Sequence, residues 1–199
     1  MKEPSHHIRA FFAIDLPENI ISNIITIQEK FKKEMPQIIK WVNPSQQHIT
    51  LKFIGALKAQ DIYPLQTAIQ KEIKSLPSFK LNVVNIGAFP NINRPKIVWV
   101  GITDYQEVIK LFEIIESNTS RLGYKKETHS FSPHITLGRI KPIASKNELL
   151  SISQTIEDMN HYQFGELRVT KVVLYKSTLT PKGPIYDLLF SETLANKSA

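Results

Sequence analysis

The tetrapeptide His-Ile-Thr-Leu occurs twice in this chain of 199 residues, at residues 48–51 and 134–137. Successive side chains of a β-strand point to opposite faces, so the histidine and threonine of each copy share one face. The isoleucine and leucine share the other face, where they can be buried. The repeat therefore predicts two equivalent strands, each carrying an imidazole and a hydroxyl on one side.

The sequence around the two tetrapeptides repeats as well. An apolar run at residues 10–15 comes before the first copy, and a similar run at residues 97–102 comes before the second. The two histidines are 86 residues apart (134 − 48), and the same offset from Phe12 leads to Val98, inside the second run. We interpret this pattern as an internal duplication in which two strand, helix, strand units face each other.

Hydrophobic periodicity predicts the elements of both halves. Apolar residues at three- and four-residue spacing indicate helices at residues 17–35, 61–75, 104–122 and 145–159. Apolar runs that are branched or alternating indicate strands at residues 8–15, 48–54, 79–89, 96–102, 134–140, 166–176 and 185–193. No linker rich in Gly, Ser or Pro separates the halves, so we expect residues 1–199 to form a single two-lobed domain.

Composition narrows the possible functions. The chain has 25 Lys and Arg against 18 Asp and Glu, a net charge of +7, which favours an anionic partner such as RNA, a nucleotide or an acidic surface. Many basic proteins bind no such partner, so charge alone leaves this open. The absence of cysteine excludes disulfides, thiolate metal sites and a cysteine nucleophile. No signal peptide or membrane-spanning run is present, and we expect a cytoplasmic protein.

Two histidines on facing strands suit a reaction in which one proton is removed and another is delivered near neutral pH. Hydrolysis of a cyclic phosphodiester has this requirement, because the attacking water loses a proton and the departing ribose oxygen gains one. We therefore expect His48 and His134 to be catalytic. Thr50 and Thr136 can donate hydrogen bonds to the phosphoryl oxygens.

The two copies differ at the fifth residue after each histidine. Arg139 offers a planar guanidinium that suits a phosphate, whereas Phe53 at the equivalent position offers a ring for a base or sugar. Strict alternation would turn a fifth residue to the opposite face. These two assignments therefore require a strand end or a β-bulge at that point.

The histidines also admit less specific interpretations. A lone histidine on a strand is more often structural than catalytic, and His6, His7, His129 and His161 lack the repeated context. A metal site could use the two motif histidines, but no carboxylate lies at a fixed short spacing from either and threonine is a poor ligand. We expect no bound metal and no cofactor.

The motif text H-I-T-L-K-F from His48 and H-I-T-L-G-R from His134 resembles the double H-x-T-x signature of the two-histidine phosphoesterase superfamily. It is most similar to the branch of RNA 2′,3′-cyclic phosphodiesterases, also called 2′-5′ RNA ligases. The flanking sequences R-A-F-F-A-I-D-L-P, V-W-V-G-I, F-S-P-H and S-T-L-T-P-K-G-P-I-Y resemble that branch too. The resemblance extends from Arg9 to about Leu194.

This resemblance implies a bilobal α+β fold in which two antiparallel sheets face each other across a central cleft, with helices on the outside. It implies metal-independent hydrolysis of RNA or nucleoside 2′,3′-cyclic phosphates to 2′-phosphates. His48 would be the proton donor and His134 the acceptor, while Phe53 and Arg139 would contact the ligand. One departure is that His129 stands where the branch commonly has a basic residue, which leaves contacts with the RNA body open.

Three functions remain in view at this point. The first is the RNA-end cyclic phosphodiesterase, with reverse 2′-5′ ligation as an added activity, acting as a monomer without a membrane partner. The second is a phosphodiesterase for a small nucleotide such as a 2′-5′ oligoadenylate. The third is a non-catalytic nucleotide- or RNA-binding module. Intact copies of both histidines and both threonines argue against the third, and the basic charge favours RNA over small nucleotides.

Overall fold

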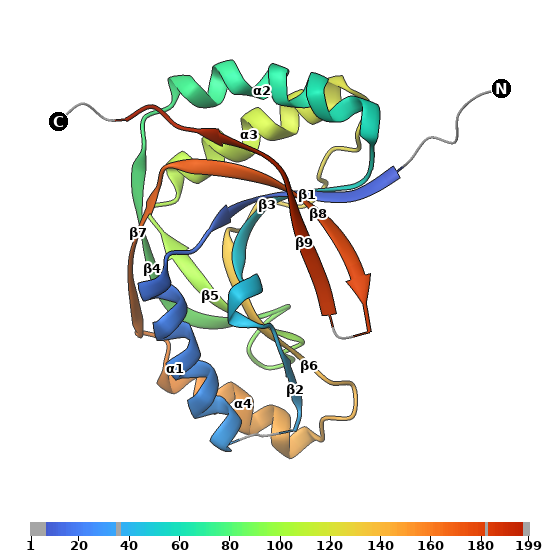
Figure 1. Cartoon of the computed structure of the whole chain (residues 1–199). Helices are drawn as coiled ribbons and strands as arrows, with labels where there is room; N and C mark the ends of the chain where they lie inside the picture. Colours follow the sequence, from blue (N-terminus) through green and yellow to red (C-terminus); the bar gives the residue numbers. More distant parts are fainter. Residues whose placement is uncertain (1–6, 35–36, 182, 197–199) are drawn as a thin grey trace.

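The computed structural model describes residues 7–34, 37–181 and 183–196 and has an α+β architecture, as the sequence predicts (Figure 1). The helices are α1 (Glu18–Glu34), α2 (Ile62–Ser75), α3 (Gln106–Arg121) and α4 (Lys146–Asp158). The strands are β1 (His7–Asp15), β2 (Ile39–Trp41), β3 (His48–Lys58), β4 (Phe79–Phe89), β5 (Ile97–Thr103), β6 (His134–Ile140), β7 (Gln163–Val169), β8 (Lys171–Thr180) and β9 (Gly183–Thr193).

The order of the strands in the sheet agrees with an internal duplication. Neighbouring strands pair in the order β7-β4-β5-β6-β3-β1-β8-β9, and β2 pairs with β6 outside this path. If β1 is matched with β5, β3 with β6, β4 with β8 and β7 with β9, the order reads the same from either end. The described strands therefore form two equivalent four-stranded sets related by a pseudo-twofold axis between β3 and β6.

The described strands form one continuous nine-stranded sheet, and its two halves correspond to the two predicted sheets. Lobe 1 contains β1, β3, β8 and β9, and lobe 2 contains β2, β4, β5, β6 and β7. They are joined where β3 and β6 run antiparallel, with Ile49 opposite Ile135. The fold class is confirmed, and the structure adds that the sheets of the two lobes meet at the two motif strands.

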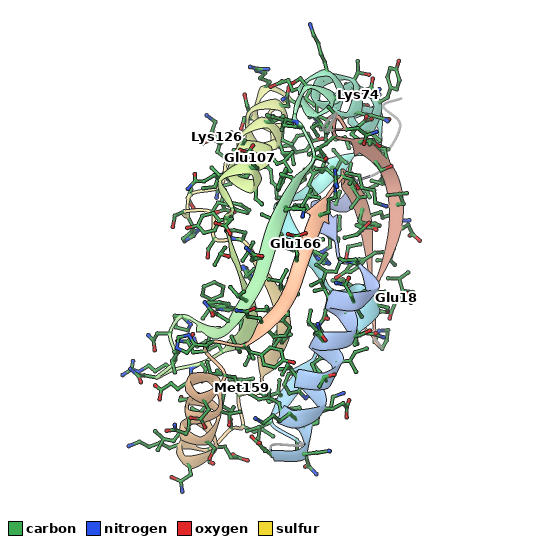
Figure 2. The ribbon with its side chains drawn as sticks, turned by 90° about the vertical axis from the view of Figure 1, so that its left-hand side faces the viewer. Glu18, Lys74, Glu107, Lys126, Met159 and Glu166 are labelled. Carbon is green, nitrogen blue, oxygen red and sulfur yellow. The ribbon has the colours of Figure 1, made fainter. Side chains whose placement is uncertain are left out.

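Helices cover the outer surfaces of both lobes. Helices α2 and α3 pack on lobe 1, while α1 and α4 pack on lobe 2 (Figure 1). Figure 2 shows the same separation from the side, with Lys74 of α2 and Glu107 of α3 at one end and Met159, just after α4, at the other. Each lobe thus has its own pair of helices on its outer surface. None of the described helices has the length and apolar character needed to cross a membrane.

Buried faces explain why these helices form where they do. The apolar residues of each helix recur every three or four positions and lie in one core; Ile24, Ile69, Ile115 and Ile156 are completely buried, one from each helix. Helix α4 begins with a capping box, in which Ser145 and Glu148 exchange side-chain to backbone hydrogen bonds. The first predicted helix extended to residue 35, which lies outside the described residues.

One predicted strand needs correction. The expected single strand at residues 166–176 is two strands, because Thr170 separates β7 in lobe 2 from β8 in lobe 1. Leu167 and Val169 are buried, as alternate residues of one strand face are. Continued alternation would bury Lys171 next, but the next buried residue is Val172. This change of phase lets the chain pass from one lobe to the other.

The short strand β2 was not predicted. It pairs with β6, where Trp41 lies opposite Gly138. A Cβ atom at position 138 would lie 2.6 Å from Ile39 Cγ2, so the close approach of β2 depends on this glycine.

Candidate active site

Strands β3 and β6 lie side by side where the two lobes meet (Figure 1). A pocket of about 650 Å³ opens there. It is lined by residues from both motif strands and from the segment that precedes β6. All the residues that the sequence singled out line it: His48, Thr50, Phe53, His134, Thr136 and Arg139. The structure therefore brings together every predicted site residue, while their chemical roles remain predictions.

The alternation predicted from the tetrapeptide is present in both strands. Each histidine and each threonine is half-buried at the pocket, whereas Ile49, Leu51, Ile135 and Leu137 are almost completely buried. Ile49 lies opposite Ile135 in an antiparallel pair, so the two tetrapeptides run in opposite directions next to each other. The histidine and the threonine of both copies line the same pocket.

The β-bulge that the assignment of Phe53 and Arg139 required is present in both strands. In β3, Thr50 pairs with Ala13 but Lys52 pairs with the next residue, Phe12, so one residue is inserted. The same shift occurs in β6 opposite β5, between Thr136 and Gly138. The bulges reverse the alternation, and Phe53 and Arg139 reach the pocket. Phe53 is 59% exposed, which leaves its ring open to a ligand.

Both catalytic candidates are oriented by a backbone carbonyl two residues earlier. His48 Nδ1 lies 2.9 Å from Gln46 O, and His134 Nδ1 lies 2.8 Å from Ser132 O. A carbonyl can only accept, so Nδ1 must carry the proton in each ring. In a neutral imidazole the remaining nitrogen, Nε2, is then the one that can accept a proton, and in an imidazolium it can donate one.

The electrostatic surroundings of the two rings differ. Burial is the largest influence on both and lowers the pKa of His48 and of His134. The carboxylate of Asp15 acts in the opposite direction on His48 and raises its pKa, whereas the guanidinium of Arg139 further lowers the pKa of His134. The charge of Asp15 therefore favours a protonated His48, although a charge on His134 acts against it by lowering the pKa of His48, and the charge of Arg139 favours a neutral His134.

Aromatic side chains that sequence reasoning did not assign to the site hold the two imidazoles. Phe11 stacks on His48 with ring centroids 4.8 Å apart, and Tyr186 meets the same ring edge-on at 5.5 Å. Phe89 meets His134 edge-on at 4.9 Å. Phe89 and Tyr186 also line the pocket. Strand alternation could have placed each ring on a face, but nothing local in the sequence shows that these strands adjoin the motifs.

Asp15 is a further residue near the site that the sequence did not identify. It lies opposite His48 in the register of β1 and β3. Its Oδ1 accepts a hydrogen bond of 2.9 Å from the Tyr175 hydroxyl, and its Oδ2 lies 3.4 Å from Lys171 Nζ. These contacts fix the carboxylate that acts on His48.

The remaining histidines differ from the motif pair. His129 lines the pocket with a highly exposed side chain, 3.3 Å from Glu127 Oε1. His7 and His161 are exposed, and His6 lies outside the described residues. Within residues 7–34, 37–181 and 183–196, no group of three or more acidic or histidine side chains is arranged to hold a metal ion.

Comparison with known proteins agrees with this geometry. The LigT like Phosphoesterase family model matches the chain twice, over residues 14–99 and 100–186. A protein of Methanocaldococcus jannaschii named RNA 2′,3′-cyclic phosphodiesterase is 38% identical over 92% of this chain and 98% of its own length.

Solved structures show the same fold. A crystal structure of a Thermus thermophilus protein matches 96% of this chain and 100% of its own, with a TM-score of 0.78 and 26% identity. Escherichia coli LigT complexed with 3′-AMP matches 94% of this chain and 98% of its own, with a TM-score of 0.75 and 26% identity.

Proposed function

Because this chain belongs to the LigT-like phosphoesterase family, we propose that it is a phosphoesterase that hydrolyses the 2′,3′-cyclic phosphate at an RNA end to a 2′-phosphate. The observation that carries the proposal is the pair of equivalent imidazoles, each with Nδ1 bonded to a carbonyl and both lining one pocket. The name of the M. jannaschii relative supports the substrate class. The net charge of +7 supports an RNA partner.

In the proposed reaction, His134 Nε2 accepts a proton from water as the water oxygen attacks phosphorus. The bond between phosphorus and O3′ breaks, and His48 Nε2 delivers a proton to the departing O3′. The product retains the phosphate on O2′, and the two imidazoles finish with exchanged protonation states. No further group is needed to balance the protons.

The assignment of the two roles is supported by the charges beside each ring. Burial lowers the pKa of His48, but the charge of Asp15 acts in the opposite direction and so favours the protonated state that a donor needs. Arg139 lowers the pKa of His134, which favours the neutral state that an acceptor needs. An exchange of the roles would work against both charges.

Charge on the phosphoryl oxygens would be stabilised by Thr50, Thr136 and Arg139, which line the pocket with the histidines. Phe53, at the pocket and largely exposed, would stack on the terminal base. We further propose that the chain acts as one two-lobed domain, as a monomer, in the cytoplasm. Reverse 2′-5′ ligation and hydrolysis of a small nucleotide such as a 2′-5′ oligoadenylate are the alternatives to be tested alongside.

The direct test incubates the purified protein, in the presence of EDTA, with a short RNA that ends in a 2′,3′-cyclic phosphate. We expect a single product, the 2′-phosphate, identified by its resistance to an enzyme specific for 3′-phosphates. Parallel incubations with a 2′-5′ oligoadenylate and with a 5′-hydroxyl RNA acceptor measure the alternatives. Loss of hydrolysis in EDTA that a divalent ion restores would contradict the metal-independent mechanism, and a 3′-phosphate product would contradict His48 as donor to O3′.

A further inference from the structure

The pseudo-twofold axis allows the neighbourhoods of the two histidines to be compared position by position. The residue opposite His48 is Asp15, and the residue opposite His134 is Gly101, 86 positions later. In lobe 1 the space beside the histidine is occupied by Asp15 and its partners Tyr175 and Lys171. In lobe 2 a glycine stands at the equivalent position.

The space next to Gly101 is a second pocket of about 240 Å³. We call it the Trp99 pocket; its lining includes Asn85, Trp99, Gly101, Tyr105, Ser132 and Asn160. It adjoins the catalytic pocket, because Phe131 and Ser132 line both. Ser132 also provides the carbonyl that orients His134. A ligand that extends from the phosphate site past this segment would enter the Trp99 pocket.

Trp99 provides an aromatic surface for this pocket. It lies opposite Thr136 in the register of β5 and β6, in the place that Ala13 has opposite Thr50. A Cβ atom at Gly87 would overlap the indole, and one at Gly101 would lie 3.2 Å from it. The indole thus lies against two glycines. Its ring is 5.3 Å from that of Phe89, which in turn contacts His134.

The polar groups of the Trp99 pocket suit a neutral ring better than a phosphate. The lining residues Asn85, Asn160 and Tyr105 have polar side chains without charge, two amides and a hydroxyl. None of the described residues that line the pocket is charged. Its volume is below the roughly 300 Å³ at which pockets for drug-sized ligands begin, and so suits a single ring system. Amides can bond to the edge of a base while an aromatic side chain stacks on its face.

From this we propose that the Trp99 pocket binds the base of the nucleotide that precedes the cyclic phosphate end of an RNA chain. The inference rests on the proposed function, since it assumes that the cyclic phosphate lies between His48 and His134. It deepens that function by assigning a binding site to the nucleotide that precedes the RNA end. This explains why the two lobes differ. Lobe 1 contacts the terminal nucleotide, and lobe 2 contacts the nucleotide before it.

The kinetic test compares two substrates, a nucleoside 2′,3′-cyclic phosphate and a dinucleotide with the same terminal nucleoside and the same cyclic phosphate. The wild-type protein should have the higher kcat/KM for the dinucleotide. Trp99→Leu should reduce the ratio of the two kcat/KM values by about 5- to 100-fold, the effect of losing one stacked base. Trp99→Phe, which keeps an aromatic ring, should reduce the ratio less.

The matched control is Trp41→Leu, which removes the other tryptophan of the chain, packed edge-on against Phe31 at 5.7 Å. This variant should leave the ratio unchanged. Using a ratio separates a binding effect from a general loss of folded protein. An unchanged ratio in Trp99→Leu would overturn the inference while leaving the proposed function intact. Failure of the wild-type protein to hydrolyse either substrate would instead overturn the proposed function.

Fluorescence gives a second readout that does not depend on turnover. In a Trp41→Phe background, Trp99 is the only tryptophan of the chain. A dinucleotide ending in a 2′-phosphate should quench its emission on saturation, because a base stacked on the indole alters its excited state. The corresponding mononucleoside 2′-phosphate should quench it much less. Equal quenching by the two ligands, or none by the dinucleotide, would overturn the inference even if hydrolysis is normal.

Discussion

Lys52 Nζ lies 2.6 Å from Glu116 Oε2, and this ion pair is buried beside the pocket between the two motif strands, with only 3% and 14% of the two side chains exposed. Lys52 lies at the bulge in β3, and Glu116 belongs to α3. The same ammonium donates to Lys125 O at 3.0 Å, and Glu116 Oε1 accepts from Glu127 N at 2.8 Å. The pair therefore fixes the segment that leads to the second motif onto the strand of the first.

Removing one member of this pair should destabilise the protein strongly. Lys52→Met leaves the Glu116 carboxylate buried without its partner, and Glu116→Gln leaves the ammonium in the same condition, each at a cost of about 3 to 5 kcal/mol in the free energy of unfolding. The double variant should recover much of this loss, since no unpaired charge remains. Urea titrations of the four proteins form the required double-mutant cycle. Strictly additive losses would mean that the two charges do not interact.

Arg139 and Phe53 occupy equivalent places in the two motifs but should behave differently on substitution. Arg139→Ala removes a charged contact to the phosphate, so kcat/KM should fall for every cyclic phosphate substrate. Phe53→Ala removes a stacking surface worth about 1 to 3 kcal/mol per base, so KM should rise chiefly for substrates that carry a base. Steady-state kinetics with a nucleoside cyclic phosphate and a base-free cyclic phosphate separate the two. Equal losses on both substrates in Phe53→Ala would rule out stacking.

The pH dependence of kcat/KM should be a bell whose limbs belong to the histidine pair. His134 must be neutral to accept a proton, so activity is lost as pH falls through its pKa. His48 must be protonated to donate, so activity is lost as pH rises through its pKa. Because burial lowers both pKa values, the maximum should lie below about pH 6.5, the pKa of an unperturbed histidine.

The variant Asp15→Asn tests whether His48 is the proton donor. The amide oxygen can still accept from the Tyr175 hydroxyl, but the negative charge that raises the pKa of His48 is gone. The alkaline limb should move to lower pH. Asp187→Asn removes the same charge from an exposed position in β9 and serves as the control with an unshifted profile. Movement of the acidic limb in Asp15→Asn would assign His48 to the base instead.

Much of the site could be predicted because it depends on residues that are close together in the sequence. A two-residue period and a repeated tetrapeptide suffice to put His48 and Thr50 on one face, and the burial of Ile49 and Leu51 follows from the same period. The need for a bulge before Phe53 also follows from counting residues. The helices were predictable because each buries one continuous apolar stripe.

The rest depends on contacts between distant parts of the chain. Tyr175 bonds to Asp15 across 160 residues, and no local pattern indicates that their strands adjoin. The Trp99 pocket beside Gly101 can be recognised only when the two lobes are compared in three dimensions. The break at Thr170 is a different case, since the apolar period changes phase there, and that change could have been noticed in the sequence.

Replacing either motif histidine by alanine should lower the rate of hydrolysis about 100- to 10,000-fold, the usual range for loss of a general acid or base. The measurement is kcat on an RNA ending in a 2′,3′-cyclic phosphate, with circular dichroism to verify folding. An asparagine side chain has no group that titrates near neutral pH, so the conservative change to asparagine should not restore activity. A variant with nearly normal turnover would remove that histidine from the mechanism.

A substrate in which the leaving O3′ is replaced by sulfur separates the two histidines by role. A thiolate departs without needing a proton, since a thiol has a pKa of about 8.5, far below that of a ribose hydroxyl. The proton donor then becomes dispensable, whereas the acceptor is still needed to activate water. His48→Ala should therefore recover much of its lost rate on the sulfur substrate, and His134→Ala should not. Rescue of His134→Ala alone would reverse the two roles, and rescue of neither would mean that the imidazoles bind phosphate without transferring protons.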